Sequence, residues 1–193
     1  MTQKKFEDYG IVLDFLPQGN PNDPRPLHLR EPVVQLLGED FFTLLEVIPK
    51  REAKFQPQER VFIGKGERDK VERIRRRIGY EDLTSAARAE LPSAVRKVVE
   101  SHPERFVEFF NKAAPVTTRF HQLELLPGIG KKLMWSILEE REKAPFSSLE
   151  DLKSRVKGLG DLKEMITTRI LKELQGEDRY RIFVRPPSKR EEE

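Results

Sequence analysis

Residues 123–133 read Leu-Glu-Leu-Leu-Pro-Gly-Ile-Gly-Lys-Lys-Leu, and this stretch decides how the C-terminal half of the chain folds. The helical spacing of apolar residues stops at Pro127 and resumes behind two lysines, which predicts a sharp turn between two helices. Pro127 ends the first helix, and Gly128 and Gly130 permit a tight turn with positive φ. Ile129 would anchor this turn in the core.

The backbone N–H groups that follow the turn are expected to lack partners. Those of Gly130, Lys131 and Lys132 stand at the start of the next helix, where no preceding turn supplies an acceptor. Such donors form an anion site together with the helix dipole, and two lysine side chains reinforce it. The pattern predicts a phosphate-binding turn formed by Gly128, Ile129, Gly130, Lys131 and Lys132, the alternative being an ordinary αα-turn without a ligand.

These residues resemble the helix-hairpin-helix motif, in which a hydrophobic residue precedes Pro-Gly-Ile-Gly and a basic residue follows. The resemblance implies that hairpin amides hold a phosphate of the nucleic-acid backbone without reading bases. Met134 departs from the motif, which usually has a small residue there. The two helices are therefore expected to pack further apart than usual.

A second copy of the pattern follows about thirty residues later, and such repeats are strong indicators of architecture. Residues 146–152 have helical apolar spacing, and Gly158-Leu-Gly160 is the second turn. Asp161 replaces the basic residue, and its carboxylate would repel a phosphate. The resemblance implies a tandem domain whose second turn is weaker or purely structural, and whose shared apolar face comprises Leu125, Leu126, Leu133, Ile137, Leu138, Leu152, Ile166 and Ile170.

Composition excludes several classes of protein. The 193 residues carry 36 Lys and Arg against 33 Asp and Glu, so the net charge of +3 does not by itself indicate a polyanionic partner. The chain has no cysteine, which excludes disulfides, thiolate catalysis and cysteine-ligated zinc. No window approaches a membrane span and the N-terminus has no apolar signal segment, so we expect a cytoplasmic protein without a membrane partner.

The first third of the chain reads as short strands. Tyr9–Leu16 is rich in β-forming residues, 32–38 and 41–48 look like a hairpin, and 60–64 adds a fourth strand. Tyr180–Val184 is predicted as a fifth strand that closes an edge. Together these strands resemble a small OB-like or S1-like barrel, a fold that binds single strands in a basic groove with stacking aromatics. Candidates are Phe41, Phe42, Phe55, Phe62, Lys50, Arg51, Lys54 and Arg60, although Phe in so small a domain is more often core.

The middle of the chain, residues 65–116, reads as helical. Val71, Ile74 and Ile78 would lie on one face of a first helix. Segment 65–77 is the densest basic stretch, and guanidinium groups suit phosphate oxygens, so this helix could extend the phosphate contacts. A solvated face with Glu/Arg pairs is equally consistent. The candidate residues here are Arg68, Lys70, Arg73, Arg75, Arg76 and Arg77.

The predicted fold is α+β and multidomain. Short helices are expected at 83–90, 92–101 and 103–112, and Thr117 or Thr118 is expected to cap the helix that enters the first turn. The domains would be an OB/S1-like β-barrel over 1–64, a basic helical middle segment over 65–116, a tandem helix-hairpin-helix domain over 117–176, and a C-terminal strand with a charged tail over 177–193. This architecture is similar to an uncharacterised archaeal family of predicted RNA-binding or nucleotide-binding proteins.

Catalytic and metal sites are poorly supported by the sequence. His28, His102 and His121 lie in separate segments, so neither a metal site nor a cofactor is predicted. Some helix-hairpin-helix proteins are base-excision glycosylases, which place an Asp about twenty residues beyond the hairpin, where Glu150 and Asp151 fall. Neither a basic nucleophile nor aromatics for a base pocket accompany Asp151.

The sequence therefore predicts a non-enzymatic protein that binds nucleic acid largely without sequence preference, with RNA favoured over DNA. Arg179 and Arg181 would add charge near the C-terminus. Two alternatives remain open at this point. One is an adaptor that binds proteins of a translation or repair assembly, and the other is a DNA-repair glycosylase or nuclease.

Overall fold

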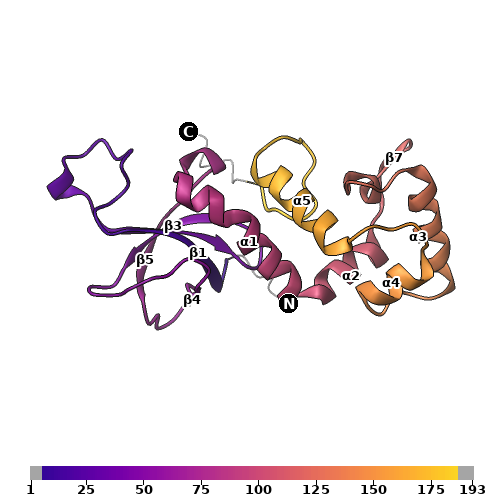
Figure 1. Cartoon of the computed structure of the whole chain (residues 1–193), viewed down its shortest axis with the longest axis horizontal. Coiled ribbons are helices and arrows are strands. Elements are labelled where there is room, and N and C mark those ends of the chain that lie inside the picture. The colour runs from indigo at the N-terminus through magenta and orange to yellow at the C-terminus, as the bar shows by residue number, and fades with distance from the viewer. Residues whose placement is uncertain (1–5, 187–193) are drawn as a thin grey trace. The chain divides into compact units, whose positions relative to one another are not determined.

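The computed structural model describes residues 6–186 and has a mixed α+β fold (Figure 1). The chain divides by its contacts into two compact units. Unit 1 comprises the residues up to Val95 and those from Glu173 onward, and unit 2 comprises Arg96–Lys172. Within residues 6–186, no helix combines the length and the apolar character that crossing a membrane requires.

Unit 1 is built on a curled, antiparallel half-barrel of five strands in the order β4-β1-β2-β3-β5 (Figure 1). The predicted strands at 9–16, 32–38 and 60–64 are confirmed. The apolar core of the sheet includes Val12, Val34, Leu36, Leu45, Val47, Phe55, Val61, Ile63 and Val71. The strands are β1 (Tyr9–Leu16), β2 (Val33–Gly38), β3 (Leu44–Pro49), β4 (Arg60–Phe62) and β5 (Val71–Arg77), with a short 3-10 helix, η1 (Leu27–Leu29), in the Pro-rich loop.

Strand β3 begins three residues later than the predicted strand at 41–48. The carboxylate of Glu7 accepts hydrogen bonds from the backbone N–H groups of Phe41 and Thr43, which are therefore not used in the sheet. Phe42 has a positive φ of 54° and a fully buried side chain. Phe55 is also buried, so these two phenylalanines are core residues and do not offer a stacking surface.

The predicted helix over 65–77 is wrong, because Val71–Arg77 forms strand β5 against β3. The register shifts twice along this pair, leaving Glu72 and Arg75 without a partner opposite them. These bulges disturb the two-residue period of the strand. As a result the apolar residues Val71 and Ile74 fall at a helical spacing although the backbone is extended.

The predicted fifth strand over Tyr180–Val184 is also wrong. The backbone N–H groups of Ile182, Phe183 and Val184 all donate to the carboxylate of Glu173, which is fully buried. Consecutive N–H groups that converge on one carboxylate cannot alternate between two neighbouring strands. The charged tail over 187–193 lies outside the described residues.

The helices of the middle segment are fewer and longer than predicted. Helix α1 (Ser85–Ser101) runs continuously through Pro92, where two separate helices were expected. Its first turn is capped by the Thr84 hydroxyl, which accepts from the N–H of Ala87 at 3.0 Å. A short 3-10 helix, η2 (Tyr80–Asp82), precedes it, and the predicted helix at 103–112 is confirmed as α2 (Pro103–Lys112).

Unit 2 places two helix-starting turns within one apolar core. The segment before the first turn is only a 3-10 helix, η3 (Gln122–Leu125), and it is capped by His121, so the predicted α-helix with a threonine cap is wrong. Of the predicted apolar face, Leu133 and Leu138 are half-buried and the other six residues are buried. The remaining elements are β6 (Pro115–Thr117), β7 (Phe120–His121), α3 (Lys131–Lys143), α4 (Leu149–Arg155) and α5 (Leu162–Leu174).

Candidate functional site

The first turn has the positive φ that was predicted at Gly128, whereas Gly130 has a φ of −95°. Gly128 has a φ of +88°, which side chains other than glycine rarely adopt. The N–H of Ile129 closes the turn on the carbonyl of Leu126 at 3.2 Å, and the Ile129 side chain is buried. Gly130 is the N-cap residue of α3 in an extended conformation. The closed turn and the buried Ile129 side chain thus set the direction in which α3 begins.

The N-terminus of α3 is open. No side chain caps it, and within residues 6–186 the N–H groups of Gly130, Lys131 and Lys132 donate to no acceptor in a turn or a side chain. A Cβ atom built on Gly130 would meet nothing within 4 Å. Unpaired donors that face free space at the positive end of a helix dipole can bind an oxyanion.

The two lysines of this turn differ in their surroundings. Lys131 Nζ donates to the backbone carbonyl of Arg119 at 2.6 Å and pairs with Glu124 Oε2 at 2.9 Å. Its charge is therefore partly used in holding η3 against α3. Lys132 is exposed and takes part in none of the ion pairs formed among residues 6–186, so it is the lysine available to a ligand.

The second turn has the same positive φ as the first, but a side chain accepts a hydrogen bond from a backbone N–H group at the start of the helix that follows it. Gly158 has a φ of +91°, and Leu159 is buried as Ile129 is. Asp161 Oδ1 accepts from the N–H of Glu164 at 3.1 Å, so this carboxylate caps α5. That hydrogen bond, with nearby Arg96, lowers the pKa of Asp161 and keeps it charged. An anion would meet an occupied, negatively charged turn here.

The two turns pack reciprocally. A Cβ atom on Gly128 would lie 3.5 Å from Met165 of α5, and one on Gly158 would lie 3.6 Å from Leu133 of α3. Each turn therefore contacts the helix that follows the other turn. This exchange is what two repeats related by a pseudo-twofold axis would produce.

Trp135 was not singled out by the sequence analysis. It is the only tryptophan of the chain, and 59% of its surface is exposed. It lies three residues after Lys132 in α3, so both side chains share one face of the helix. Helical spacing relative to the buried Met134 and Ile137 could have placed it on the solvent side. An exposed indole beside an uncapped helix N-terminus is a surface that a flat apolar group can contact.

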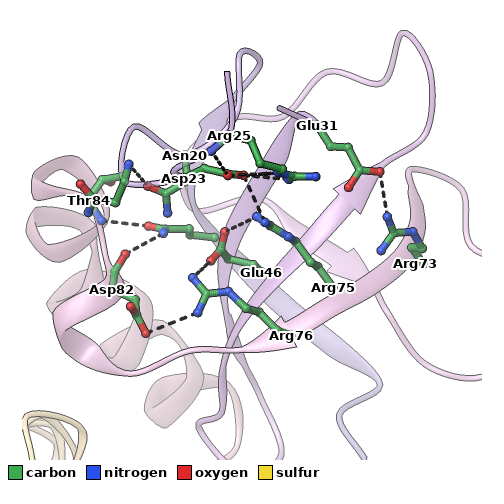
Figure 2. A network of polar contacts seen from close by, with 12 residues as sticks. Asn20, Asp23, Arg25, Glu31, Glu46, Arg73, Arg75, Arg76, Asp82 and Thr84 are labelled. Carbon is green, nitrogen blue, oxygen red and sulfur yellow. Dashed lines mark hydrogen bonds and ion pairs between the residues drawn. The ribbon is translucent and has the colours of Figure 1, made fainter. Parts of the chain in front are cut away.

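Three arginines of the predicted basic helix, Arg73, Arg75 and Arg76, pair with carboxylates within unit 1. Figure 2 shows the network around Glu46, whose side chain is fully buried. Arg76 Nη2 lies 2.6 Å from Glu46 Oε1, and Arg75 Nη1 lies 3.4 Å from Glu46 Oε2. Arg75 also reaches Asp23 at 3.3 Å. The bulge at Arg75 is what turns two consecutive arginines toward the same carboxylate.

The other basic residues of this segment are also engaged. Arg73 pairs with Glu31 at 2.8 Å, and Lys70 pairs with Glu59. Phosphate binding by this segment stays a prediction, but its ion pairs leave less charge for a phosphate. Backbone carbonyl oxygens accept hydrogen bonds from the last two, Arg68 and Arg77.

The remaining predicted residues belong to other elements than the first turn. Arg179 and Arg181 belong to unit 1, and the Arg179 guanidinium lies over the Tyr180 ring at 4.6 Å. Asp151, the candidate acid of a glycosylase, accepts from the N–H of Ser147 and pairs with Arg155 at 3.2 Å. These contacts stabilise the first turn of α4. Among the described residues no group of His, Asp and Glu is arranged to hold a metal ion.

His121 links protonation to the segment that leads into the first turn. Its Nδ1 accepts from the N–H of Leu123 at 3.1 Å, so this nitrogen carries no proton. Burial, reinforced by Arg141, lowers the pKa of His121 below its usual 6.5. Protonation would remove the acceptor and would place a charge in the core of unit 2.

We therefore expect stability to fall as the pH drops below 6.5. Below pH 6.5 the unfolded chain binds a proton at His121, whereas the folded chain binds it only at lower pH because its pKa is lowered. The contribution of neutral His121 to the free energy of unfolding is therefore complete above pH 6.5. It is lost as the pH falls to the pKa of His121 in the folded chain. One group can contribute at most about 1.4 kcal/mol between pH 7.5 and 5.5. Urea unfolding of wild type and of His121→Asn at pH 7.5 and at pH 5.5 measures this difference in the free energy of unfolding. Equal pH dependence in the two proteins would exclude His121 as the cause.

Comparison with known proteins places the chain in a family. Residues 6–185 match the family described as protein of unknown function (DUF655). An uncharacterised protein of Methanocaldococcus jannaschii is 48% identical over 184 residues, which are 94% of this chain and 82% of the relative. A crystal structure from Archaeoglobus fulgidus, titled as a member of DUF655, has 49% identity and a TM-score of 0.81 and covers 93% of this chain and 100% of its own. The resemblance to an uncharacterised archaeal family is thus confirmed, and the chain belongs to the DUF655 family.

Proposed function

We propose that this protein binds nucleic acid without reading its sequence and without catalysis, holding a backbone phosphate at the first turn of unit 2. The observation that carries the proposal is the contrast between the turns. The N–H groups at Gly130, Lys131 and Lys132 are uncapped, whereas Asp161 caps the equivalent turn. An uncapped helix N-terminus beside an exposed lysine is suited to binding a phosphate, and only the first of the two turns has both features.

We infer that unit 2 is a tandem helix-hairpin-helix domain. Three features support this inference: positive φ at Gly128 and Gly158, a buried residue after each of these glycines, and the reciprocal packing of the turns. The curled sheet of unit 1 supports kinship with partly open, OB-like or S1-like barrels that bind single strands. That kinship is the reason for favouring RNA over DNA, and cytoplasmic location follows from the same role.

Trp135 strengthens the case for a nucleic-acid backbone over a free anion. A phosphate held at Gly130 would bring a sugar or a base toward the same face of α3, where the indole is exposed. As the only tryptophan, Trp135 also reports on this site directly. Its fluorescence is expected to change when RNA binds.

Replacing Lys132 with alanine tests the proposal. Loss of one phosphate contact should weaken binding to all sequences alike and should flatten the slope of log K against log salt by about 0.7 to 0.9. The measurement is fluorescence anisotropy of labelled RNA and DNA of several sequences at increasing salt. Lys157→Ala removes the same charge beside the second turn and should leave affinity and slope unchanged. Unaltered binding by Lys132→Ala would refute the assignment of the turn.

A protein-binding role is the second candidate, and the acidic character of the second turn favours it. Asp161 and Glu164 are both largely exposed, although each lies near Arg96. An exposed acidic turn suits a basic protein surface better than a phosphate. Partners retained after nuclease treatment of a pull-down would support the adaptor role, and loss of every partner would eliminate it.

A further inference from the structure

A cavity of about 470 Å³ lies in unit 1 and shares Leu45 and Ile63 with the half-barrel core. Its apolar walls include Phe6, Phe41 and Ile74, and they continue into the core through Leu45 and Ile63. Volume and lining are those of sites that take small organic ligands. Phe6 and Ile74 are exposed large apolar residues, so the cavity presents apolar surface to solvent.

The cavity is also rimmed by positive charge, from Lys65, Arg68, Arg77 and Arg185. The bulge at Arg75 explains how Arg77 comes to be there. It turns Arg75 and Arg76 toward Glu46, and it leaves Ile74 and Arg77 facing the cavity. Within strand β5, Arg75 and Arg76 therefore pair with Glu46, whereas Arg77 lines the cavity.

At the rim, the charges of Lys65 and Arg68 are not neutralised by carboxylates of residues 6–186, in contrast to the arginine charges around Glu46. Arg68 Nε donates to the carbonyl of Gly64 at 2.8 Å, which leaves its charge in place. Lys65 and Arg68 take part in no ion pair within residues 6–186, and Lys65 Nζ lies 5.4 Å from the Phe6 ring. A ligand that enters the cavity is therefore expected to be an anion.

The acidic residue in the lining, Glu7, does not oppose this expectation. Its two carboxylate oxygens accept from the backbone N–H groups of Asp40, Phe41 and Thr43, so they hold the turn before β3. Burial raises the pKa of Glu7, although the hydrogen bonds from these N–H groups act in the opposite direction. Gly38 makes room for it, since a Cβ atom there would lie 2.2 Å from Glu7 Cδ.

We propose that this cavity binds one nucleotide, with its base against Phe6, Phe41 and Ile74 and its phosphate at Lys65 and Arg68. A base needs flat apolar contact and a phosphate needs cations, and the cavity supplies both side by side. The nucleotide is either free or an unpaired residue of a strand, since the two share this chemistry. The site belongs wholly to unit 1, so it does not depend on the turn in unit 2.

The test uses the full chain and isothermal titration calorimetry with adenosine monophosphate, adenosine and inorganic phosphate. Single-site binding of adenosine monophosphate, tighter than that of either fragment, is expected. Phe6→Ala and Lys65→Ala should each weaken it about fivefold or more, in line with the energy of one stacked base or one charged contact. Both side chains are exposed, so neither substitution is expected to impair folding. Lys157→Ala removes an exposed lysine of unit 2, outside the cavity lining, and should leave adenosine monophosphate binding unchanged.

A short single-stranded oligonucleotide separates the two sources of the nucleotide. If adenosine monophosphate fails to bind but Phe6→Ala and Lys65→Ala weaken the oligonucleotide, the occupant is a residue of a strand. Inorganic phosphate that binds as tightly as adenosine monophosphate would overturn the base contact and hence the proposal. Unchanged affinities for both probes in both variants would also overturn it. Lys132→Ala should leave adenosine monophosphate binding intact, which distinguishes failure of this site from failure of the turn.

Discussion

Replacing Gly130 with aspartate is expected to lower the affinity for nucleic acid about tenfold or more without destabilising the protein. Gly130 is the N-cap of α3, has an extended backbone and has free space where a side chain would stand. An aspartate there would accept the N–H groups of the first turn, as Asp161 does at α5. The new carboxylate would occupy the donors and repel a phosphate, and each charge-assisted hydrogen bond is worth about 1.5–3 kcal/mol.

The effect on stability has the opposite sign to the effect on binding. An aspartate at an N-cap interacts favourably with the helix dipole, by about 0.3–1 kcal/mol. We therefore expect the thermal midpoint of Gly130→Asp to equal or exceed that of wild type while its affinity for RNA is lower. Gly130→Ala adds a side chain without closing the donors and should bind close to wild type. If Gly130→Asp binds RNA as well as Gly130→Ala does, the turn does not hold a phosphate.

Replacing Glu46 with alanine is expected to cause a large loss of stability, about 3–5 kcal/mol. Its carboxylate has no exposed surface and accepts from Arg75 and Arg76 of the neighbouring strand (Figure 2). Truncation would leave the largely buried guanidinium of Arg75 with Asp23 alone and would open a void beside β2. The free energy of unfolding in urea, followed by far-ultraviolet circular dichroism, measures the loss.

Two variants control this result. Glu46→Gln keeps the volume and one acceptor oxygen, so it should lose less stability than Glu46→Ala. Glu31→Ala breaks the pair with Arg73, in which both side chains are about half exposed, and should cost less than about 1 kcal/mol. A loss for Glu46→Ala no greater than that for Glu31→Ala would show that the buried network does not stabilise the sheet.

Local chemistry made part of this structure predictable. Strand β1 was predicted with its observed bounds because an unbroken run of β-forming residues ends at a Pro-rich loop. Helix α2 was predicted because Pro103 fits the first turn of a helix. The turn at Gly128 was predicted because a tight turn with positive φ favours glycine. Each of these features depends on residues within a few positions of one another.

The sequence by itself therefore determined the two turns, the first strands and helix α2, whereas tertiary structure decided which charges stay available. Arg75 and Arg76 meet Glu46 across about thirty residues of chain, and Glu173 gathers the N–H groups of the C-terminal segment. Spacing along the chain cannot reveal such partners, because ion pairing depends on distance in space. The same strand pairing built the cavity beside Ile74 and Arg77, two residues that the sequence placed on a helix.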